Sequence, residues 1–175
     1  MLAASSFASS ALVPADLQAE LISKLAAYDR NFSARARPTA VVLIVSRPGN
    51  PRSSLGAAVM KSEFAKLERI GGLPHRENVI PFEGAAALAK RCRAEGAAIV
   101  YLTPGLEDQV AEIQKALTGL DILSVSGVPE SVPEGIVLGF ELVSGKPKIL
   151  LNLPQAKRQN VSFKADVLKL MKVYR

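Results

Sequence analysis

Apolar residues along this chain follow two patterns that alternate along the sequence: short continuous runs and longer stretches with helical spacing. Residues 39–46 form a continuous apolar run rich in β-branched side chains, which is typical of a strand covered on both faces. Residues 97–103 and 121–126 predict a second and a third buried strand. Between them lie longer stretches that repeat apolar residues at helical spacing and end at glycine. Strands that alternate with helices predict right-handed crossovers and a parallel sheet.

Helix boundaries are marked by turn and cap residues. Pro14 and Asp16 open the first predicted helix, because proline suits a first turn and an acid favours the positive end of the helix dipole. After the first strand, Ser53 or Ser54 is expected to cap a helix that runs towards Ile70.

The remaining elements complete a three-layer prediction. Residues 78–82 form a short strand near an edge, since Pro81 cannot donate to a ladder. Residues 136–142 and 148–153 predict a hairpin, and 162–173 a basic amphipathic helix. The expected fold is an α/β three-layer sandwich with a mostly parallel sheet of five or six strands. It has an antiparallel C-terminal hairpin at one edge and helices on both faces.

A chain of 175 residues fits one domain, here residues 14–175, which can bury its own core. Residues 1–13 are small, apolar and nearly uncharged, and we expect a flexible leader that is the remnant of a signal peptide. A leader of a cytosolic protein is the alternative. No run approaches the roughly 20 apolar residues of a membrane span.

Positive charge is concentrated near the C-terminus. Residues 1–145 carry a net charge of −1 and residues 146–175 a net charge of +7. Such a segment attracts nucleic acid, anionic lipid or an acidic protein, although a solvated helix face explains it most simply. Aromatic residues make up only 5% of the chain, which argues against specific nucleic-acid binding because stacking platforms are scarce.

The candidate ligand site lies where the strands end. Ligands of open α/β sheets bind outside the carboxyl ends of the strands, and a helix N-terminus there favours an anion. The sequence places a low-specificity set of candidates at these ends: Ser46, Arg47, Arg52, Ser54 and Ser126. A capped helix beside two solvated arginines is the simpler interpretation, since the chain has no nucleotide-binding glycine motif.

No catalytic or metal-binding constellation is evident. His75 is the one histidine and falls in a predicted surface loop. Cys92 is the one cysteine, so it is expected to be structural although neighbouring cations favour reactivity. Glu130 and Glu134 flank a loop proline, and a solvated loop is favoured over an acid/base pair. We expect no catalytic residue, metal or cofactor.

The C-terminal third resembles the YfiR-like family of exported bacterial proteins. The similar pieces are a strand ending at Ser126, Gly135 at the start of the next, the run 148–153 with its Asn-Leu pair, Ala156, and the segment 161–170. The similarity is clear over about 120–175 and collinear over 39–119.

This resemblance implies a compact α/β domain, an exported location, no catalysis and, often, a homodimer. Characterised members repress membrane-bound diguanylate cyclases by binding their periplasmic part, and some use disulfides for redox control. The chain lacks the family's Trp-Pro element after the first helix, where it has residues 28–32, and it lacks paired cysteines. Disulfide control is therefore not carried over.

Three functions remain to be compared. The leading hypothesis is a non-enzymatic, periplasmic or otherwise exported regulator that binds a protein partner. The partner would be the extracytoplasmic part of a signalling protein such as a diguanylate cyclase. The first alternative is a domain that binds a small anion or a nucleotide, either as an enzyme or as a binding protein. The second is a nucleic-acid-binding protein that uses the basic C-terminal segment.

Overall fold

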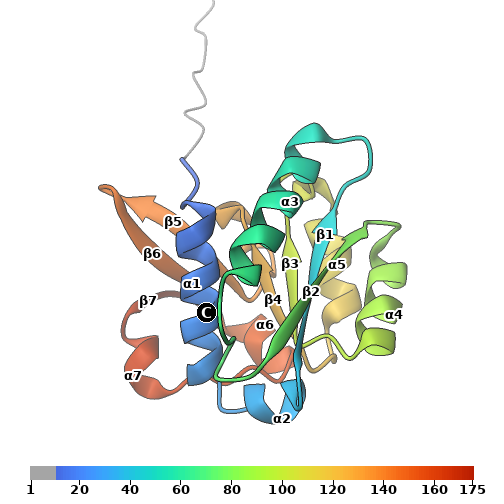
Figure 1. Cartoon of the computed structure of the whole chain (residues 1–175). Helices are drawn as coiled ribbons and strands as arrows, with labels where there is room; N and C mark the ends of the chain where they lie inside the picture. Colours follow the sequence, from blue (N-terminus) through green and yellow to red (C-terminus); the bar gives the residue numbers. More distant parts are fainter. Residues whose placement is uncertain (1–10) are drawn as a thin grey trace, which may run out of the picture.

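One seven-stranded sheet organises the computed structural model, which describes residues 11–175 (Figure 1). The strand order is β2-β1-β3-β4-β5-β6-β7. Neighbours from β2 to β5 are parallel, β5 and β6 are antiparallel, and β6 and β7 are parallel. The strands are β1 Ala40–Ser46, β2 His75–Pro81, β3 Ile99–Leu102, β4 Leu123–Ser126, β5 Leu138–Val143, β6 Lys146–Asn152 and β7 Met171–Tyr174.

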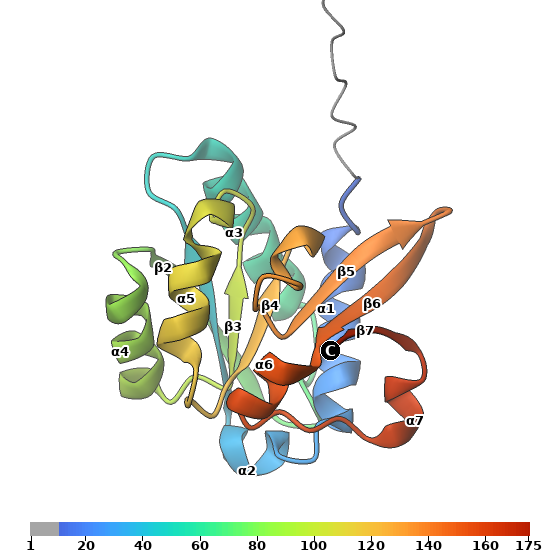
Figure 2. The same cartoon turned by 180° about the vertical axis from the view of Figure 1, so that it is seen from behind.

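Helices cover both faces of this sheet. In Figure 1, α1 and α3 lie in front of the strands, and the opposite view shows α4 and α5 on the other face (Figure 2). The helices are α1 Ala15–Tyr28, α2 Phe32–Ala36, α3 Pro51–Ala65, α4 Ala85–Glu95, α5 Val110–Leu117, α6 Leu153–Arg158 and α7 Ala165–Leu168. The predicted α/β three-layer class is therefore confirmed.

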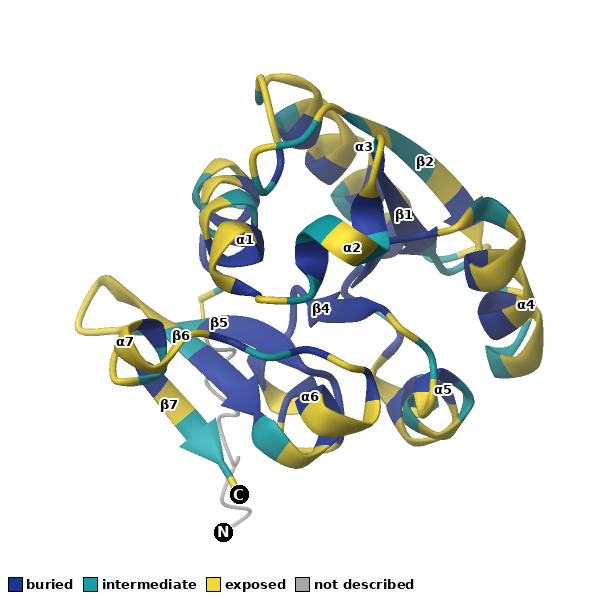
Figure 3. Ribbon diagram, turned by 90° about the horizontal axis from the view of Figure 1, so that it is seen from below, coloured by how far each residue is buried: buried dark blue, intermediate teal, exposed yellow. Residues whose placement is uncertain are grey.

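The apolar runs form central strands because each side of the strand meets a different hydrophobic layer. Along β1, Val42 and Ile44 belong to the core beneath α1 and α3, while Val41, Leu43 and Val45 belong to the core beneath α4 and α5. A strand buried on both faces has no need of alternating polar residues. Seen from below, the central strands β1 and β4 are dark, whereas the edge strands β2 and β7 and the outer sides of the helices are largely exposed or half-buried (Figure 3).

The C-terminal helix predicted over 162–173 is wrong. Only the single turn of α7 forms, and β7 then adds a seventh strand outside the hairpin, so β7 and not the hairpin is the edge. Met171 is buried and Lys172 exposed, which is the two-residue alternation of a strand. Parallel pairing with β6 places Met171 beside Ile149 and Val173 beside Leu151.

The start of α3 also differs from the prediction. The helix begins at Pro51, and the Asn50 side chain is its N-cap, accepting a hydrogen bond from the Ser53 amide at 3.1 Å. Ser53 and Ser54 therefore lie inside the first turn and do not cap it. The predicted edge strand is confirmed and extends from His75.

Near the N-terminus, Val13 is already part of the packed domain. Its side chain is buried, and its carbonyl accepts a hydrogen bond from the Gln18 side chain. The leader predicted over 1–13 falls mostly in residues 1–10, which lie outside the described residues. Within residues 11–175, no helix has the length and apolarity required to cross a bilayer.

Candidate functional site

A buried hydroxyl cluster joins the carboxyl ends of β1 and β3. The Thr103 hydroxyl donates to the Val45 carbonyl at 2.7 Å, so the Ser53 hydroxyl, 2.6 Å away, donates to Thr103. Ser53 in turn accepts from the Arg47 amide at 2.7 Å. These bonds fix the loop after β1 and the first turn of α3 against the loop after β3.

The Arg47 side chain crosses to the loop after β3 and is held there. Its guanidinium donates to the Gly105 carbonyl at 2.9 Å and makes a two-pronged ion pair with Asp108. This pairing raises the pKa of Arg47 and lowers the pKa of the Asp108 carboxyl, in each case chiefly through the hydrogen bond between the two side chains. One of the two candidate cations therefore already has a counterion within the chain.

Arg52 has an acidic neighbour as well. Its guanidinium lies 3.8 Å from the Glu107 carboxylate, which also accepts from the Gly105 amide at 2.6 Å. The Gly105 backbone lies against Asn50, since a Cβ at Gly105 would come within 2.7 Å of the Asn50 side-chain nitrogen, and its φ is +105°. Arg47, Arg52 and their two carboxylates thus form a charge-balanced cover, which we call the carboxyl-edge latch.

The other predicted site residues are placed apart from this latch. Ser46 is half-buried at the end of β1, and Ser54 is exposed on the first turn of α3. Ser126 is buried at the end of β4, where its hydroxyl accepts from the Val128 amide and closes a local turn. Of the five predicted site residues, Arg47 and Arg52 are the two whose side chains take part in the ion pairs of the latch.

Sequence reasoning missed the partners that change the character of the latch. Glu107 and Asp108 are acids in the first turn of a predicted helix, where the helix dipole alone would explain them; in the structure both pair with arginines, from the loop after β1 and from α3. Thr103 follows a buried strand and is itself buried. A polar residue directly after such a run was the available signal, because a buried hydroxyl needs a partner.

A second polar cluster lies at the opposite, amino-terminal ends of the strands. Arg35 pairs with Asp29 at 2.7 Å and with Asp121 at 2.7 Å, and it also donates to the Asn160 carbonyl at 2.8 Å. The side chains of Arg35 and Asp29 are 2% and 0% exposed. Asp29 also accepts from the Ser162 amide at 3.0 Å. This cluster ties α1 and α2 to the last third of the chain.

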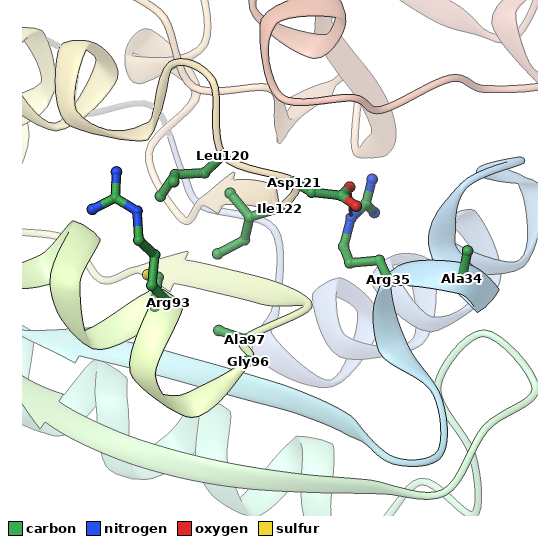
Figure 4. A pocket seen from close by; sticks show the side chains of 9 residues that line it. Ala34, Arg35, Arg93, Gly96, Ala97, Leu120, Asp121 and Ile122 are labelled. Carbon is green, nitrogen blue, oxygen red and sulfur yellow. Dashed lines mark hydrogen bonds and ion pairs between the residues drawn. The ribbon is translucent and has the colours of Figure 1, made fainter.

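A cavity of about 280 Å³ adjoins that cluster (Figure 4). Arg35 and Asp121 stand at one side of it and Arg93 at the other. Cys92 also lines it, and burial raises the pKa of its thiol to about 12. Burial therefore outweighs the neighbouring cation Arg93, which lowers the thiol pKa, and the thiol stays protonated at neutral pH.

The Asn-Leu pair after β6 has a structural explanation. The side-chain oxygen of Asn152 caps α6 by accepting a hydrogen bond from the Gln155 amide at 3.0 Å. The side-chain nitrogen of Asn152 donates to the Val132 carbonyl at 2.9 Å. Gln155 then bonds to Gln159, which donates to the Ile122 carbonyl and to Ser124. Asn152, one of the residues that carry the family resemblance, is therefore joined through Gln155 and Gln159 to β4 by a buried chain of hydrogen bonds.

Residues 11–175 hold no group of three or more His, Cys, Asp or Glu side chains arranged to bind a metal ion. His75 belongs to β2, not to a loop, and its ring bonds to Glu77 and to the Leu67 carbonyl.

The architecture is shared with domains of substrate-binding proteins. A protein described as the ABC domain in complex with L-Trp from Streptococcus pneumoniae is 11% identical, with a TM-score of 0.66. The ligand-free, open substrate-binding protein with adhesive properties from Clostridium difficile is 13% identical, with a TM-score of 0.62. A conserved domain protein from Vibrio cholerae is 13% identical, with a TM-score of 0.59.

The match covers 91% of this chain and 61% of the Streptococcus chain, and 93% and 60% for the other two. This chain thus spans about three-fifths of their length, and the likeness concerns the fold. No curated protein sequence matches the chain.

The fold and its clusters define an α/β domain of the kind found in these proteins. The sequence assigns it further, because residues 15–172 match the family of YfiR/HmsC-like proteins. The chain belongs to that family, and the resemblance seen first in its C-terminal third extends over nearly its whole length.

Proposed function

We propose that this protein is a non-enzymatic, exported regulator that binds the extracytoplasmic part of a signalling protein, such as a membrane-bound diguanylate cyclase. The observation that carries the proposal is the family match over residues 15–172. Regulators of this kind act through a surface, so they need a rigid domain and not a reactive centre. The seven-stranded sheet with its two buried polar clusters supplies such a domain.

The carboxyl-edge latch gives further support. A ligand anion would have to displace Asp108 from Arg47 and compete with Glu107 for Arg52. In a domain that acts by docking, the same ion pairs hold two loops in place and need no ligand.

Affinity capture from the native cell envelope tests the proposal. The chain is expressed from its native gene with a C-terminal tag, cross-linked in intact cells, and recovered from the envelope and the cytosol separately. We expect a membrane signalling protein in the envelope sample. Recovery of cytosolic partners alone, with no exported protein, would overturn both the location and the docking.

A small-anion-binding domain is the second candidate, favoured by one specific observation. Arg47 and Arg52 both lie at the carboxyl edge of a sheet whose architecture resembles substrate-binding domains. A thermal-shift screen against phosphorylated metabolites discriminates it from docking. Stabilisation that disappears in an Arg47→Ala/Arg52→Ala double variant supports anion binding, whereas no stabilisation by any compound rules against it.

A further inference from the structure

The two edges of the sheet differ in chemistry. The edge strand β2 contains Pro81, which has no amide to donate, and carries charges of both signs at Arg76 and Glu77. The other edge strand, β7, has no proline. The charged residues within it and up to two positions from its ends are cations: Lys169, Lys172 and Arg175. Lys169 also lies 3.9 Å from the exposed carboxylate of Asp166. An exposed strand edge is a template for pairing with another strand unless a protein blocks it.

The outer side of β7 has no backbone partner in the described chain. Its one neighbour is β6, with pairs from Ile149–Met171 to Asn152–Tyr174. No other backbone hydrogen bond within residues 11–175 involves Met171 to Tyr174. Figure 3 shows β7 at the rim of the molecule, exposed or half-buried along most of its length. The backbone groups that face away from β6 therefore have no backbone partner within residues 11–175.

Leu170 adds an apolar contact point directly before the strand. Its side chain is 65% exposed, which is high for a leucine next to a strand. On the sheet face shared with Glu141, Lys172 lies 3.4 Å from that carboxylate and 5.5 Å from the centre of the Tyr174 ring. Lys146 and Lys148 lie along the neighbouring strand β6 and are exposed. The rim thus combines one apolar anchor with several cations.

We propose that β7 accepts an extended, acidic segment of the partner protein as an eighth strand. Backbone hydrogen bonds along Met171–Tyr174 would provide the pairing, and carboxylates of the incoming strand would meet Lys169, Lys172 and Arg175. The inference rests on the proposed function, because it names the surface and the chemistry of a docking partner.

Charge selects this occupant over a second copy of the chain. If two β7 strands paired antiparallel about Lys172, that lysine would face the same residue of the second copy, and Lys169 would face Arg175. Like charges directly opposite one another destabilise a strand pair. The cations that guard this edge against self-pairing therefore attract an acidic strand.

The first test uses synthetic peptides of eight residues and follows backbone amide signals of the whole chain by NMR. One peptide alternates Glu and Val, a second alternates Lys and Val, and a third is the Glu peptide with proline in place of alternate valines. We expect the Glu–Val peptide to shift the amide signals of Met171–Tyr174 selectively and to slow their exchange. The proline and lysine peptides should leave these signals unchanged.

A charge-reversed variant, Lys169→Glu/Arg175→Glu, provides the second arm. We expect its affinity for the Glu–Val peptide to fall by at least about tenfold. The matched control is Lys61→Glu/Lys90→Glu, which changes the net charge equally at two exposed lysines on α3 and α4. The control should bind within about twofold of the wild type, and far-UV circular dichroism checks that both variants are folded.

Specific outcomes overturn the inference. Equal loss in the two variants would mean that only net charge matters, and shifts confined to other strands would place the binding elsewhere. Binding to phosphatidylglycerol vesicles that depends on Lys169 and Arg175, without peptide binding, would identify a membrane surface instead.

The envelope capture separates this inference from the proposed function. If the wild type captures a membrane protein and Lys169→Glu/Arg175→Glu captures it equally well, the function stands and the β7 surface is wrong. If the wild type captures none, the proposed function fails whatever the peptides do.

Discussion

Individual charged residues in this protein fall into two kinds that look similar in sequence and differ in burial. Arg35 and Asp29 form an ion pair with side chains that are almost fully buried, whereas the Arg47–Asp108 pair at the carboxyl-edge latch is well exposed. Exposed pairs contribute little to stability, while a buried charge that loses its partner is costly. Residue-scale predictions follow from this contrast.

Arg35→Ala should strongly destabilise the fold, because it leaves the buried Asp29 without its cation and removes the bonds to Asp121 and the Asn160 carbonyl. We expect a loss of about 3–5 kcal/mol in the free energy of unfolding, measured by urea denaturation. Arg47→Ala is the control and should change the unfolding free energy little. Equal losses in the two variants would contradict the distinction.

The Cys92 thiol should be unreactive in the native state. Burial raises its pKa to about 12, and only the thiolate is nucleophilic. With a thiol reagent at pH 8, we expect slow labelling of folded protein and rapid labelling in urea. Because the folded state holds this proton more tightly than the unfolded state, stability should fall as the pH rises above the ordinary thiol pKa. Rapid labelling of the native protein would contradict the buried position.

At the scale of the elements, two of the helices that connect the strands begin with the same N-cap, an asparagine side chain. Asn50 caps α3 and Asn152 caps α6, each followed by proline in the first turn. Asn152 differs because its amide nitrogen also donates to the Val132 carbonyl and its side chain is buried. One residue thereby fixes both the end of β6 and the loop before β5.

Asn152→Ala should therefore cost more stability than Asn50→Ala. Loss of a cap alone is expected to cost about 1 kcal/mol. Loss of the second bond to the Val132 carbonyl, which keeps the Gly135 amide as a donor, should add about 1 kcal/mol in the Asn152 variant. Thermal or urea unfolding of the two variants measures the difference. The prediction fails if Asn50→Ala is the more destabilised.

The sequence predicted the strands that are buried on both faces well. It predicted less well those elements whose conformation depends on pairing with a neighbouring strand. The continuous runs of β1, β3 and β4 have one physical explanation, and they were placed within a few residues. β7 has only four residues, and Val173 also fits a helical stripe with Phe163, Val167 and Leu170. Its strand form depends on β6 as a neighbour, which local pattern cannot reveal.

The same limit applies to the carboxyl-edge latch. The loop after β1 and its arginines could be placed by the rule for open sheets, since they directly follow a buried strand. Their pairing with Glu107 and Asp108 depends on the register of β1 with β3, where Val45 lies beside Leu102. A contact across 61 positions of sequence leaves no mark in either segment alone.

At the scale of the whole molecule, the sheet should open from its C-terminal rim. β1 and β3 are paired on both sides and lie between two hydrophobic layers, whereas β7 is paired on one side only. In hydrogen exchange of the native protein, we expect β7 amides to exchange at least about tenfold faster than those of β1. Addition of an acidic strand to β7 should reduce this difference. Equal rates in β1 and β7 without any partner would contradict this description.

The contacts between α1 and the last third of the chain have a consequence for folding during synthesis, because α1 is made long before the residues that anchor its end. The end of α1 is held by the Tyr28 carbonyl, which accepts from the Lys164 amide, and by the Arg30 amide, which donates to the Ser162 carbonyl. The ribosome makes these partners more than 130 residues after the helix itself. Helix α1 therefore lacks this anchor until residues 162–164 have been made. Folding that depends on such distant contacts is slow, so the end of α1 should be fixed late, after the strands that lie between these two segments in the sequence have been made.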